Sequence, residues 1–313
     1  MASIFVDGAE GTTGLRIDDF LAARPDLEVI RIAPELRKDA VARAQCLNTA
    51  DVAVLCLPDV ASREAVALIS NPHTRIIDAS TAHRVDPAWA YGLPELGDGQ
   101  REKIAASKRV CVGGCHATGF ILAVRPLVRA GILPVDHPVI AQSLTGYSGG
   151  GKSLIAKFES TQDSHLAICP YALALNHKHL PEMRHYSGLS HAPLFLPAVG
   201  AFYQGMIVSI FLENRTLPGA AGRDRIEAAL RAAYDYENAV QVLGIAESGL
   251  LEDGMLSPTA CNGTNRVDLL VAGHDKQTAV LARLDNLGKG AAGAAMQCLN
   301  LMLGVEEFQG LHL

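Results

Sequence analysis

Cys115 is the residue of this sequence best placed for covalent chemistry. It lies in the segment Gly113-Gly114-Cys115-His116-Ala117-Thr118-Gly119, between a strand-like apolar run at 110–112 and a helix-like apolar run at 120–128. The spacing therefore predicts a thiol at a helix N-terminus, where free backbone N–H groups and the helix dipole stabilise a thiolate. We expect Cys115 to be a nucleophile for acyl transfer. The cysteines at 56, 111 and 298 lie on predicted strands or in the last predicted helix, and we expect them to be inert.

A covalent mechanism also needs a proton donor, and the segment from Asn176 to Glu182 is the richest in candidates, with His177 and His179. His116 is adjacent to the cysteine, but neighbours at a helix start rarely face one another, so we expect it to pack or to orient other groups. In an extended stretch, His-x-His places both rings on one face, where they could hold zinc together with Glu182. No further ligand spacing supports a metal, and we expect none.

A nucleotide site is predicted directly after the first strand-like run. Glycines occupy positions 8, 11 and 14 there, and a helical pattern follows from Leu15 to Ala23. Glycines let the backbone approach a pyrophosphate closely, and a helix N-terminus favours its negative charge. The spacing is GxxGxxG rather than the commoner GxGxxG. The expected cofactor contacts in this turn are Gly8, Gly11, Thr12, Thr13 and Gly14.

Basic residues at the end of the second strand-like run favour NADP over NAD. Arg31, Arg37 and Lys38 lie at this point of the chain. Cations there suit a 2′-phosphate better than a bare ribose. Glu35 is the residue that could reverse this choice, because a carboxylate suits ribose hydroxyls.

The element pattern that must position these groups is α/β. In the first 115 residues, short apolar runs alternate with helical stretches, and the runs are continuously apolar, which predicts a doubly wound parallel sheet covered on both faces. From about 120 to 266 the alternation is lost, which predicts a second, mixed α+β domain with a helix near 224–236; a small-residue helix follows at 289–303. The predicted strands of the first domain are Ile4 to Val6, Leu27 to Ile32, Val52 to Leu57, Ile76 to Ile77 and Val110 to Val112.

Composition narrows the class of protein further. The chain has 313 residues and a net charge of −6 without basic blocks, so nucleic acid is not an expected partner. The uncharged stretch from Ala192 to Leu212 is divided by prolines and glycines, which favours buried strands over a membrane span. Seven cysteines without a Cys-x-x-Cys pair, and an N-terminus without export features, indicate a reducing cytoplasm.

Two alternatives from other classes remain open. The segment from Gly146 to Ser153 matches the P-loop pattern G-x-x-x-x-G-K-[ST], which on its own indicates an ATP or GTP hydrolase. Against this interpretation, no convincing later strand ends in a magnesium-binding aspartate, and the segment follows five predicted strands and the thiol site instead of opening a sheet. A non-enzymatic Rossmann sensor that binds NADP is the other alternative, but it gives Cys115 no purpose.

Taken together, the motifs resemble those of the N-acetyl-gamma-glutamyl-phosphate reductases, a family related to aspartate-semialdehyde dehydrogenases. The resemblance covers essentially the whole chain. The Cys-His-Ala-Thr motif is similar to that of the family's shorter subgroup. The chain departs from the commoner Asn-Pro-Gly-Cys-Tyr-Pro-Thr pattern around an unchanged cysteine. The segments that carry the resemblance are residues 8–14, 78–84, 91–96, 113–119, 148–152, 177–182 and 285–304.

The resemblance implies a Rossmann-type NADP-binding domain over 1–115 and 286–313, and a glyceraldehyde-phosphate-dehydrogenase-like catalytic and oligomerisation domain over 116–285. It implies a homodimer or homotetramer that reduces N-acetyl-L-glutamyl 5-phosphate with NADPH to N-acetyl-L-glutamate 5-semialdehyde and phosphate, in arginine biosynthesis. Cys115 would carry the thioester, and His179, or as second choice His177, would protonate the oxyanion.

Further contacts are implied on both sides of the reaction. Ser80 and Asn286 join Arg31 and Arg37 as expected cofactor contacts. The residues expected to contact substrate are Arg84, Ser148, Lys152 and Glu182. A related semialdehyde dehydrogenase, such as aspartate-semialdehyde dehydrogenase, is the alternative within the same chemistry, because only contacts to the substrate would differ.

Overall fold

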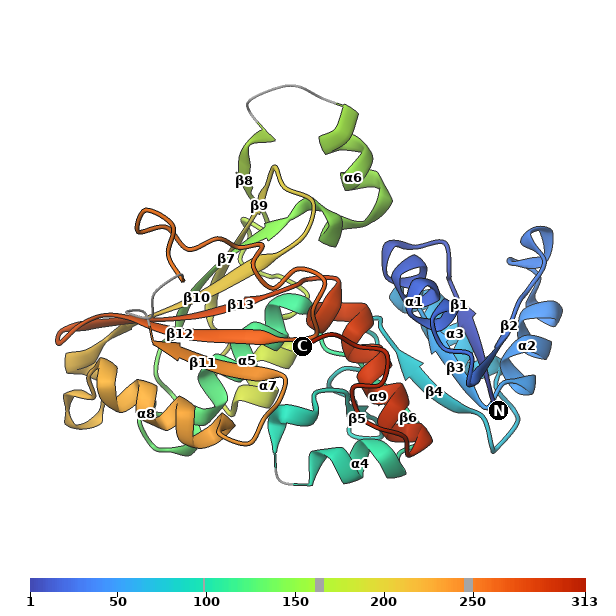
Figure 1. Ribbon diagram of the computed structural model, residues 1–313, viewed down its shortest axis with the longest axis horizontal. Helices are drawn as coiled ribbons and strands as arrows, with labels where there is room; N and C mark the ends of the chain where they lie inside the picture. The colour runs from blue at the N-terminus through green and yellow to red at the C-terminus, as the bar shows by residue number, and fades with distance from the viewer. Residues whose placement is uncertain (98, 161–165, 245–249) are drawn as a thin grey trace. The chain divides into compact units, whose positions relative to one another are not determined.

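Parallel strands and crossover helices build the first of two compact units, which comprises Met1–Gly114 and Ala291–His312. The computed structural model describes residues 1–313 except 98, 161–165 and 245–249. The described strands of this unit form one sheet in the order β2-β1-β3-β4-β6-β5, and every neighbouring pair is parallel (Figure 1). The strands are β1 (Ala2–Asp7), β2 (Leu27–Ile30), β3 (Val52–Leu55), β4 (Arg75–Asp78), β5 (Ala90–Tyr91) and β6 (Arg109–Cys111).

The helices of this unit fall into two packing groups. Helix α1 packs against α9, which in turn packs against α4, whereas α2 packs against α3. Strands added on opposite sides of β1 by right-handed crossovers place their helices on opposite faces, so the sheet is doubly wound, as the sequence predicted. The helices are α1 (Thr12–Ala22), α2 (Ala40–Thr49), α3 (Asp59–Leu68), α4 (Gln100–Ala106) and α9 (Gly293–Leu303).

The second unit, Cys115–Gly290, contains a mixed sheet in the order β11-β12-β13-β10-β7-β9-β8. The pairs β7·β9 and β11·β12 are parallel, and the remaining neighbours are antiparallel. This confirms the predicted mixed α+β organisation. The strands are β7 (Ile140–Gly146), β8 (Ile168–Pro170), β9 (Leu194–Gly200), β10 (Met206–Glu213), β11 (Val240–Gly244), β12 (Val267–His274) and β13 (Gln277–Leu284).

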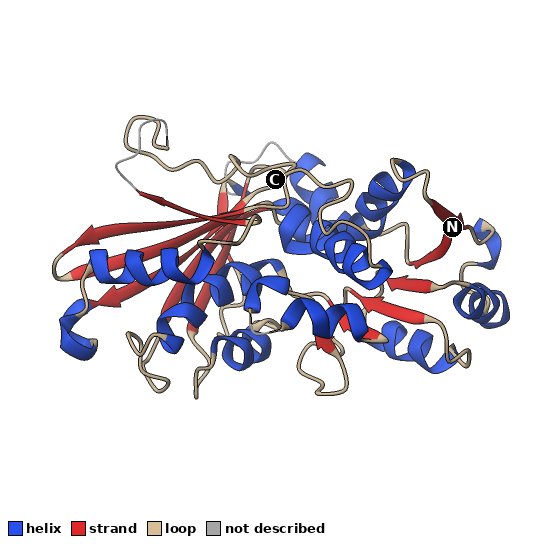
Figure 2. Cartoon of the chain, turned by 60° about the horizontal axis from the view of Figure 1, so that its bottom comes forward, coloured by secondary structure: helices blue, strands red, loops and turns tan. Residues whose placement is uncertain are grey.

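Helices cover one face of this mixed sheet. Helix α5 (Cys115–Arg129) packs on β10 and β13, α8 (Arg223–Tyr234) packs on β11 and β12, and α7 (Leu180–Ser187) packs against α5. Figure 2 shows these helices gathered on one side of the fan of strands. On the opposite face, Ile140, Leu194 and Phe211 are exposed. Each is followed or preceded along its strand by a buried residue. Helix α6 (Gly151–Ser160) follows β7 through a short 3-10 turn, Tyr147–Gly150.

Helix α5 carries the predicted nucleophile at its first residue, and two features fix its position. Gly119 allows close packing on the sheet, because a β-carbon there would lie 3.0 Å from Val208 Cγ2. Pro126 lies inside the helix and has no N–H to donate to the carbonyl of Leu122. The hydroxyl of Tyr234 on α8 donates to that carbonyl instead, at 2.7 Å. The helix therefore keeps a buried proline without leaving a backbone acceptor unpaired.

The uncharged stretch from Ala192 to Leu212 is divided between β9 and β10, as the sequence predicted. No helix in the described parts of the chain is long and apolar enough to span a membrane. The helix predicted over Lys289 to Leu303 begins with a π-helical turn, Gly288–Ala292, before α9. Such turns often occur at functional sites.

Candidate active site

Cys115 is the first residue of α5 and is partly exposed, which is the placement that the sequence predicted. Its side chain lies against the π-helical turn, where Gly290 leaves room for it. A β-carbon at position 290 would come within 2.6 Å of the Cys115 Cβ. The cysteine at the start of α5 thus lies against a backbone position, residue 290, that leaves no room for a side chain.

Histidine and aromatic rings gather beside the start of α5. The ring of His116 lies 5.2 Å from that of His177 and 5.5 Å from that of His179, centroid to centroid. The rings of His177 and His179 meet edge to face at 4.6 Å. Phe195, on β9, packs at 5.4 Å from His116. The structure therefore brings together the two histidines that the sequence proposed as acids and adds His116 to the cluster.

His116 is buried, and both of its ring nitrogens are engaged. Nδ1 lies 2.9 Å from the hydroxyl of Ser143 on β7, and Nε2 lies 2.8 Å from the hydroxyl of Tyr171. Burial lowers the pKa of His116 to about 3, and electrostatic interactions with His177 and Lys178 lower the pKa further. The ring is therefore neutral at physiological pH and serves as a hydrogen-bonding link.

The segment that carries the other two histidines leads into α7. The backbone N–H of His179 donates to Nδ1 of His177 at 3.2 Å, so in this geometry the His177 proton is on Nε2. His179 is buried at the N-terminus of α7, and Glu182, one turn later, is also buried. Among the described residues, no group of three or more histidine, cysteine, aspartate or glutamate side chains is arranged to hold a metal ion.

The glycine turn after β1 forms one side of a pocket in the first unit. Gly8 has φ +86°, and a β-carbon there would lie 2.4 Å from the carbonyl oxygen of Cys56. The N–H of Gly11 donates to the carbonyl of Gly8, and a β-carbon on Gly14 would lie 2.5 Å from the same oxygen. The turn therefore requires glycine at positions 8 and 14, whereas a β-carbon at position 11 would make ordinary contacts. It leads directly into Thr12 and Thr13 at the start of α1.

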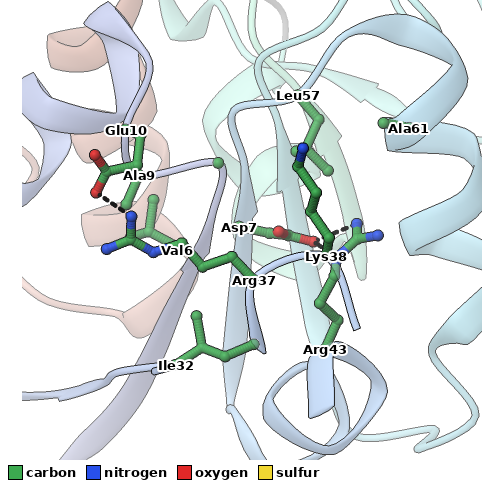
Figure 3. Close-up of a pocket in the computed structure, with 11 residues that line it drawn as sticks. Val6, Asp7, Ala9, Glu10, Ile32, Arg37, Lys38, Arg43, Leu57 and Ala61 are labelled. Carbon is green, nitrogen blue, oxygen red and sulfur yellow. Dashed lines mark hydrogen bonds and ion pairs between the residues drawn. The ribbon is translucent and has the colours of Figure 1, made fainter. Parts of the chain in front are cut away.

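The pocket has a volume of about 390 Å³ and a basic lining. Figure 3 shows Arg37 paired with Glu10, at 2.9 Å, and Arg43 paired with Asp7, at 2.8 Å. Lys38 lines the same pocket. The three cations exceed the two carboxylates, so the pocket favours an anionic ligand.

Arg31 and Glu35, which the sequence linked to the choice of cofactor, lie outside the lining of this pocket. Arg31 pairs with Asp18 at 2.7 Å and does not belong to the lining of this pocket. Glu35 is exposed in a 3-10 turn, Pro34–Leu36, and is also absent from the lining. Arg43, which the sequence argument did not select, does line the pocket.

The loop after β4 is organised by the buried carboxylate of Asp78. Ser80 donates to it through its N–H, at 2.9 Å, and its hydroxyl, at 2.7 Å. Nδ1 of His83 lies 2.7 Å from the same carboxylate, and its ring stacks on Trp89. Arg84 is buried, and its guanidinium donates to the carbonyls of Val112 and Ala79. The structure thus places Arg84 as a clamp between this loop and the end of β6.

The P-loop-like segment has the expected order of strand, loop and helix, but its backbone is already hydrogen-bonded. The N–H groups of Gly146, Tyr147 and Ser148 donate to the carbonyls of Gly205, Phe202 and Tyr203. These bonds tie the first three residues of the segment to the loop at 202–205, and the segment continues through a 3-10 turn, Tyr147–Gly150, into the start of α6.

Asn286 and Ser148 contact each other within this second unit. Nδ2 of Asn286 donates to the hydroxyl of Ser148 at 3.0 Å, and its Oδ1 accepts from the N–H of Gly205 at 2.8 Å. Both side chains are buried. Lys152, the second residue of α6, is exposed and is the cation of this segment that faces solvent.

Sequence reasoning missed partners that are distant along the chain. Ser143 and Tyr171 lie 27 and 55 residues from His116. Ser143 is one of the alternate, buried positions of β7, and this alternation is the one sequence signal that could have identified it. Arg43 lies on α2, further along the chain than the basic residues that follow β2.

Comparisons with known proteins agree with this architecture. Residues 33–107 match the family model described as semialdehyde dehydrogenase, NAD binding domain, and residues 115–286 match semialdehyde dehydrogenase, dimerisation domain. Among solved structures, aspartate semialdehyde dehydrogenase II of Vibrio cholerae has a TM-score of 0.71 at 13% identity, covering 97% of this chain and 98% of that one. The Francisella tularensis enzyme has a TM-score of 0.72 at 14% identity, covering 97% and 100%. These structures show the fold.

Closer relatives cover nearly the whole chain. N-acetyl-gamma-glutamyl-phosphate reductase 2 of a Nostoc species is 50% identical over 98% of both chains. The reductase of Burkholderia orbicola is 46% identical over 96% of this chain and 97% of its own, and reductase 2 of Pseudomonas putida is 45% identical over 98% of both.

Proposed function

Since the chain belongs to the N-acetyl-gamma-glutamyl-phosphate reductase family of semialdehyde dehydrogenases, we propose that it reduces N-acetyl-L-glutamyl 5-phosphate to N-acetyl-L-glutamate 5-semialdehyde and phosphate. This places it in arginine biosynthesis as an oxidoreductase. The observation that carries the proposal is Cys115 at the start of α5, with three histidine rings beside it. A nucleophile and proton-carrying groups are what acyl transfer requires.

The first step is acyl transfer to the thiol. The Cys115 thiolate attacks the γ-carbonyl carbon, a C–S bond forms, and the C–O bond to phosphate breaks. The leaving phosphate carries away the bonding pair, so the product is a thioester on Cys115. The N-terminus of α5 favours the anionic sulfur that starts this step.

The glycine turn and the basic pocket fit a dinucleotide phosphate. Gly8 and Gly14 let the turn pack tightly, and Gly11 precedes α1, where a pyrophosphate would accept from the N–H groups of Thr12 and Thr13. We assign the 2′-phosphate to Arg37, Lys38 and Arg43, which favours NADP over NAD. When bound, NADPH supplies the hydride that reduces the thioester carbonyl.

A histidine then supplies the proton. His179 is our first choice, because its buried ring lies at the start of α7, 5.5 Å from the ring of His116, the neighbour of the nucleophile in sequence. His177 is the second choice, with its proton on Nε2. Protonation at the carbonyl oxygen gives the hemithioacetal. The histidine then takes the hydroxyl proton back as the C–S bond breaks, which releases the aldehyde and the thiolate.

The assembly and the location follow from the same family. The matched dimerisation domain has an exposed apolar row across three adjacent strands, where Ile140 is paired in register with Leu194 and Phe211. We propose that this row lies in the interface of a homodimer, or of a homotetramer built from it.

None of the seven cysteines is in a disulfide, which supports a reducing cytoplasm. The nucleotide domain would comprise 1–115 and 286–313, and the substrate domain 116–285.

One assay tests the proposal directly. Phosphate-dependent reduction of NADP is followed with N-acetylglutamate semialdehyde and, in parallel, with aspartate semialdehyde. We expect faster turnover of the acetylated substrate and none without phosphate or arsenate. Faster turnover of aspartate semialdehyde would instead assign the chain to the related dehydrogenase.

A further inference from the structure

Asp285 is completely buried directly after β13, and the reaction described above gives its carboxylate no role. The carboxylate accepts three hydrogen bonds. Oδ1 accepts from the N–H of Leu287 at 2.9 Å, and Oδ2 accepts from the N–H of Gly263 at 2.8 Å and from Nε2 of Gln204 at 2.9 Å. A carboxylate is an acceptor only, so the three donors match it. The side chain therefore ties the segment that leaves β13 to two other loops of the second unit.

The backbone of the same residue holds the other end of this turn. The carbonyl of Asp285 accepts from the N–H of Gly290 at 2.9 Å, across the five residues that a π-helical bond spans. Between them, a β-carbon on Gly288 would come within 2.3 Å of the carbonyl oxygen of Thr264 and 3.1 Å of the Asp285 Cβ. The turn from 285 to 290 is thus fixed at its start by the Asp285 side chain, at its end by the Asp285 carbonyl, and between them by close packing.

Gly290 is the point at which this turn meets the nucleophile. A β-carbon there would lie 2.6 Å from the Cys115 Cβ, so the glycine backbone lies directly against the cysteine. A shift of the turn therefore shifts the boundary that holds the cysteine side chain. A displacement near 1 Å at a reacting centre can cost about 100-fold in rate.

We propose that Asp285 is a positioning residue for acyl transfer: its carboxylate fixes the turn from 285 to 290, and the turn fixes the side chain of Cys115. The proposal rests on the thioester mechanism proposed above. Asparagine cannot take the place of the aspartate, because an amide nitrogen would then face an N–H donor, either that of Leu287 or that of Gly263.

Asp285→Asn separates positioning from thiolate formation. Rapid-quench measurement of the phosphate released from N-acetylglutamyl phosphate without NADPH gives the rate of acyl transfer in a single turnover. We expect this rate to fall by about ten-fold, the equivalent of one lost hydrogen bond to a charged group. The pH midpoint for alkylation of Cys115 by iodoacetamide should equal that of the wild type, because the start of α5 still favours the thiolate. A wild-type rate of acyl transfer in folded Asp285→Asn, or a shifted midpoint, would overturn the proposal.

Gln204→Ala is the milder variant, because it removes one of the three donors and keeps the carboxylate. We expect a smaller fall in the rate of acyl transfer. If Asp285→Asn does not fold, this variant decides, and a wild-type rate in it would overturn the proposal.

Asn214→Ala is the matched control. Asn214 is buried at the opposite end of β10, where its Nδ2 donates to the carbonyls of His274 and Asp275 at 3.2 and 3.1 Å. Its loss should lower thermal stability and leave the rate of acyl transfer unchanged. An equal fall in the control would mean that any loosened loop has this effect, and would overturn the proposal.

The combination of Asp285→Asn with Gly290→Ala tests the route of the effect. Both changes act on one turn, so we expect the combined loss of rate to be smaller than the product of the two single losses. Losses that multiply would mean that Asp285 does not act through Gly290, and would overturn the proposal. A fully active Cys115→Ser variant would instead refute the thioester mechanism on which the proposal rests.

Discussion

The backbone of Gly290 lies against the side chain of Cys115, and a β-carbon at position 290 would approach the Cys115 Cβ to 2.6 Å and its Cα to 3.2 Å. The N–H of Gly290 donates to the carbonyl of Asp285, so the glycine is also tied to its own turn. Any side chain there must push the nucleophile or the turn aside. The position of the sulfur therefore depends on a glycine 175 residues away in sequence.

Gly290→Ala is expected to lower kcat by about 100-fold, because a displacement near 1 Å at a reacting centre costs about this much. Gly222→Ala is the matched control, since nothing lies within 4 Å of a β-carbon at that position. Steady-state kinetics and thermal unfolding of both variants make the comparison. Wild-type kcat in folded Gly290→Ala would show that this contact does not position the thiol.

The buried His116 makes stability depend on pH. Its pKa is about 3 in the folded protein and 6.5 in the unfolded chain, so between these values the unfolded state binds more protons. The free energy of unfolding contributed by this group is therefore complete above pH 6.5 and is lost as pH falls, with a slope approaching about 1.4 kcal/mol per pH unit.

Replacing His116 with phenylalanine should remove that slope. Urea unfolding between pH 4.5 and 7 is expected to show a shallower fall in His116→Phe than in the wild type. The exposed His73, replaced by glutamine, serves as the control and should leave the slope unchanged. Parallel curves for wild type and His116→Phe would mean that the ring is protonated in the fold.

The basic pocket in the first unit should discriminate between the two nicotinamide cofactors. Arg37→Ala together with Lys38→Gln is expected to raise the Kd for NADPH by about ten-fold or more, because charged hydrogen bonds to the 2′-phosphate are lost. The Kd for NADH should change little. Arg31→Ala, which breaks only the pair with Asp18, is the control. Fluorescence titration of the wild type and both variants measures the two dissociation constants of each, and an equal loss for NADPH and NADH would contradict the assignment.

The apolar row on the mixed sheet should govern assembly. Phe211 is 45% exposed and faces Ile140 across the β10·β7 pair. Phe211→Asp places a charge in the proposed interface, and we expect a lower molar mass by light scattering at micromolar concentration. Tyr236→Asp, at a residue that is 95% exposed after α8, should leave the mass unchanged. An unaltered oligomer in Phe211→Asp would place the interface elsewhere.

Local patterns predicted the parts of the fold that local physics determines. The apolar runs predicted β1 to β4 and β6, and the glycine turn predicted the start of α1, because burial on both faces and tight turns are visible in sequence. Strand β5 is only two residues long, too short to form such a run. The helix predicted after Lys289 was found, but its π-helical first turn has no sequence signal comparable to a proline or glycine cap.

In the candidate site, too, local features could be predicted from the sequence and tertiary contacts could not. The position of Cys115 at a helix start follows from the segment around it, whereas its contact with Gly290 and the links of His116 to Ser143 and Tyr171 depend on tertiary packing. The P-loop match illustrates the opposite error. Its letters and its strand-loop-helix order are present, but the N–H groups of its first three residues donate to carbonyls of residues 202–205, and the relatives that match nearly the whole chain are reductases.

The thioester on Cys115 is tested most directly by intact-protein mass spectrometry after the enzyme is mixed with N-acetylglutamyl phosphate in the absence of NADPH and quenched in acid. We expect one N-acetylglutamyl group per chain, one phosphate released with it, and the label on the peptide that contains Cys115. An acyl group on another residue, or no adduct from an enzyme that turns over normally when NADPH is added, would contradict the mechanism.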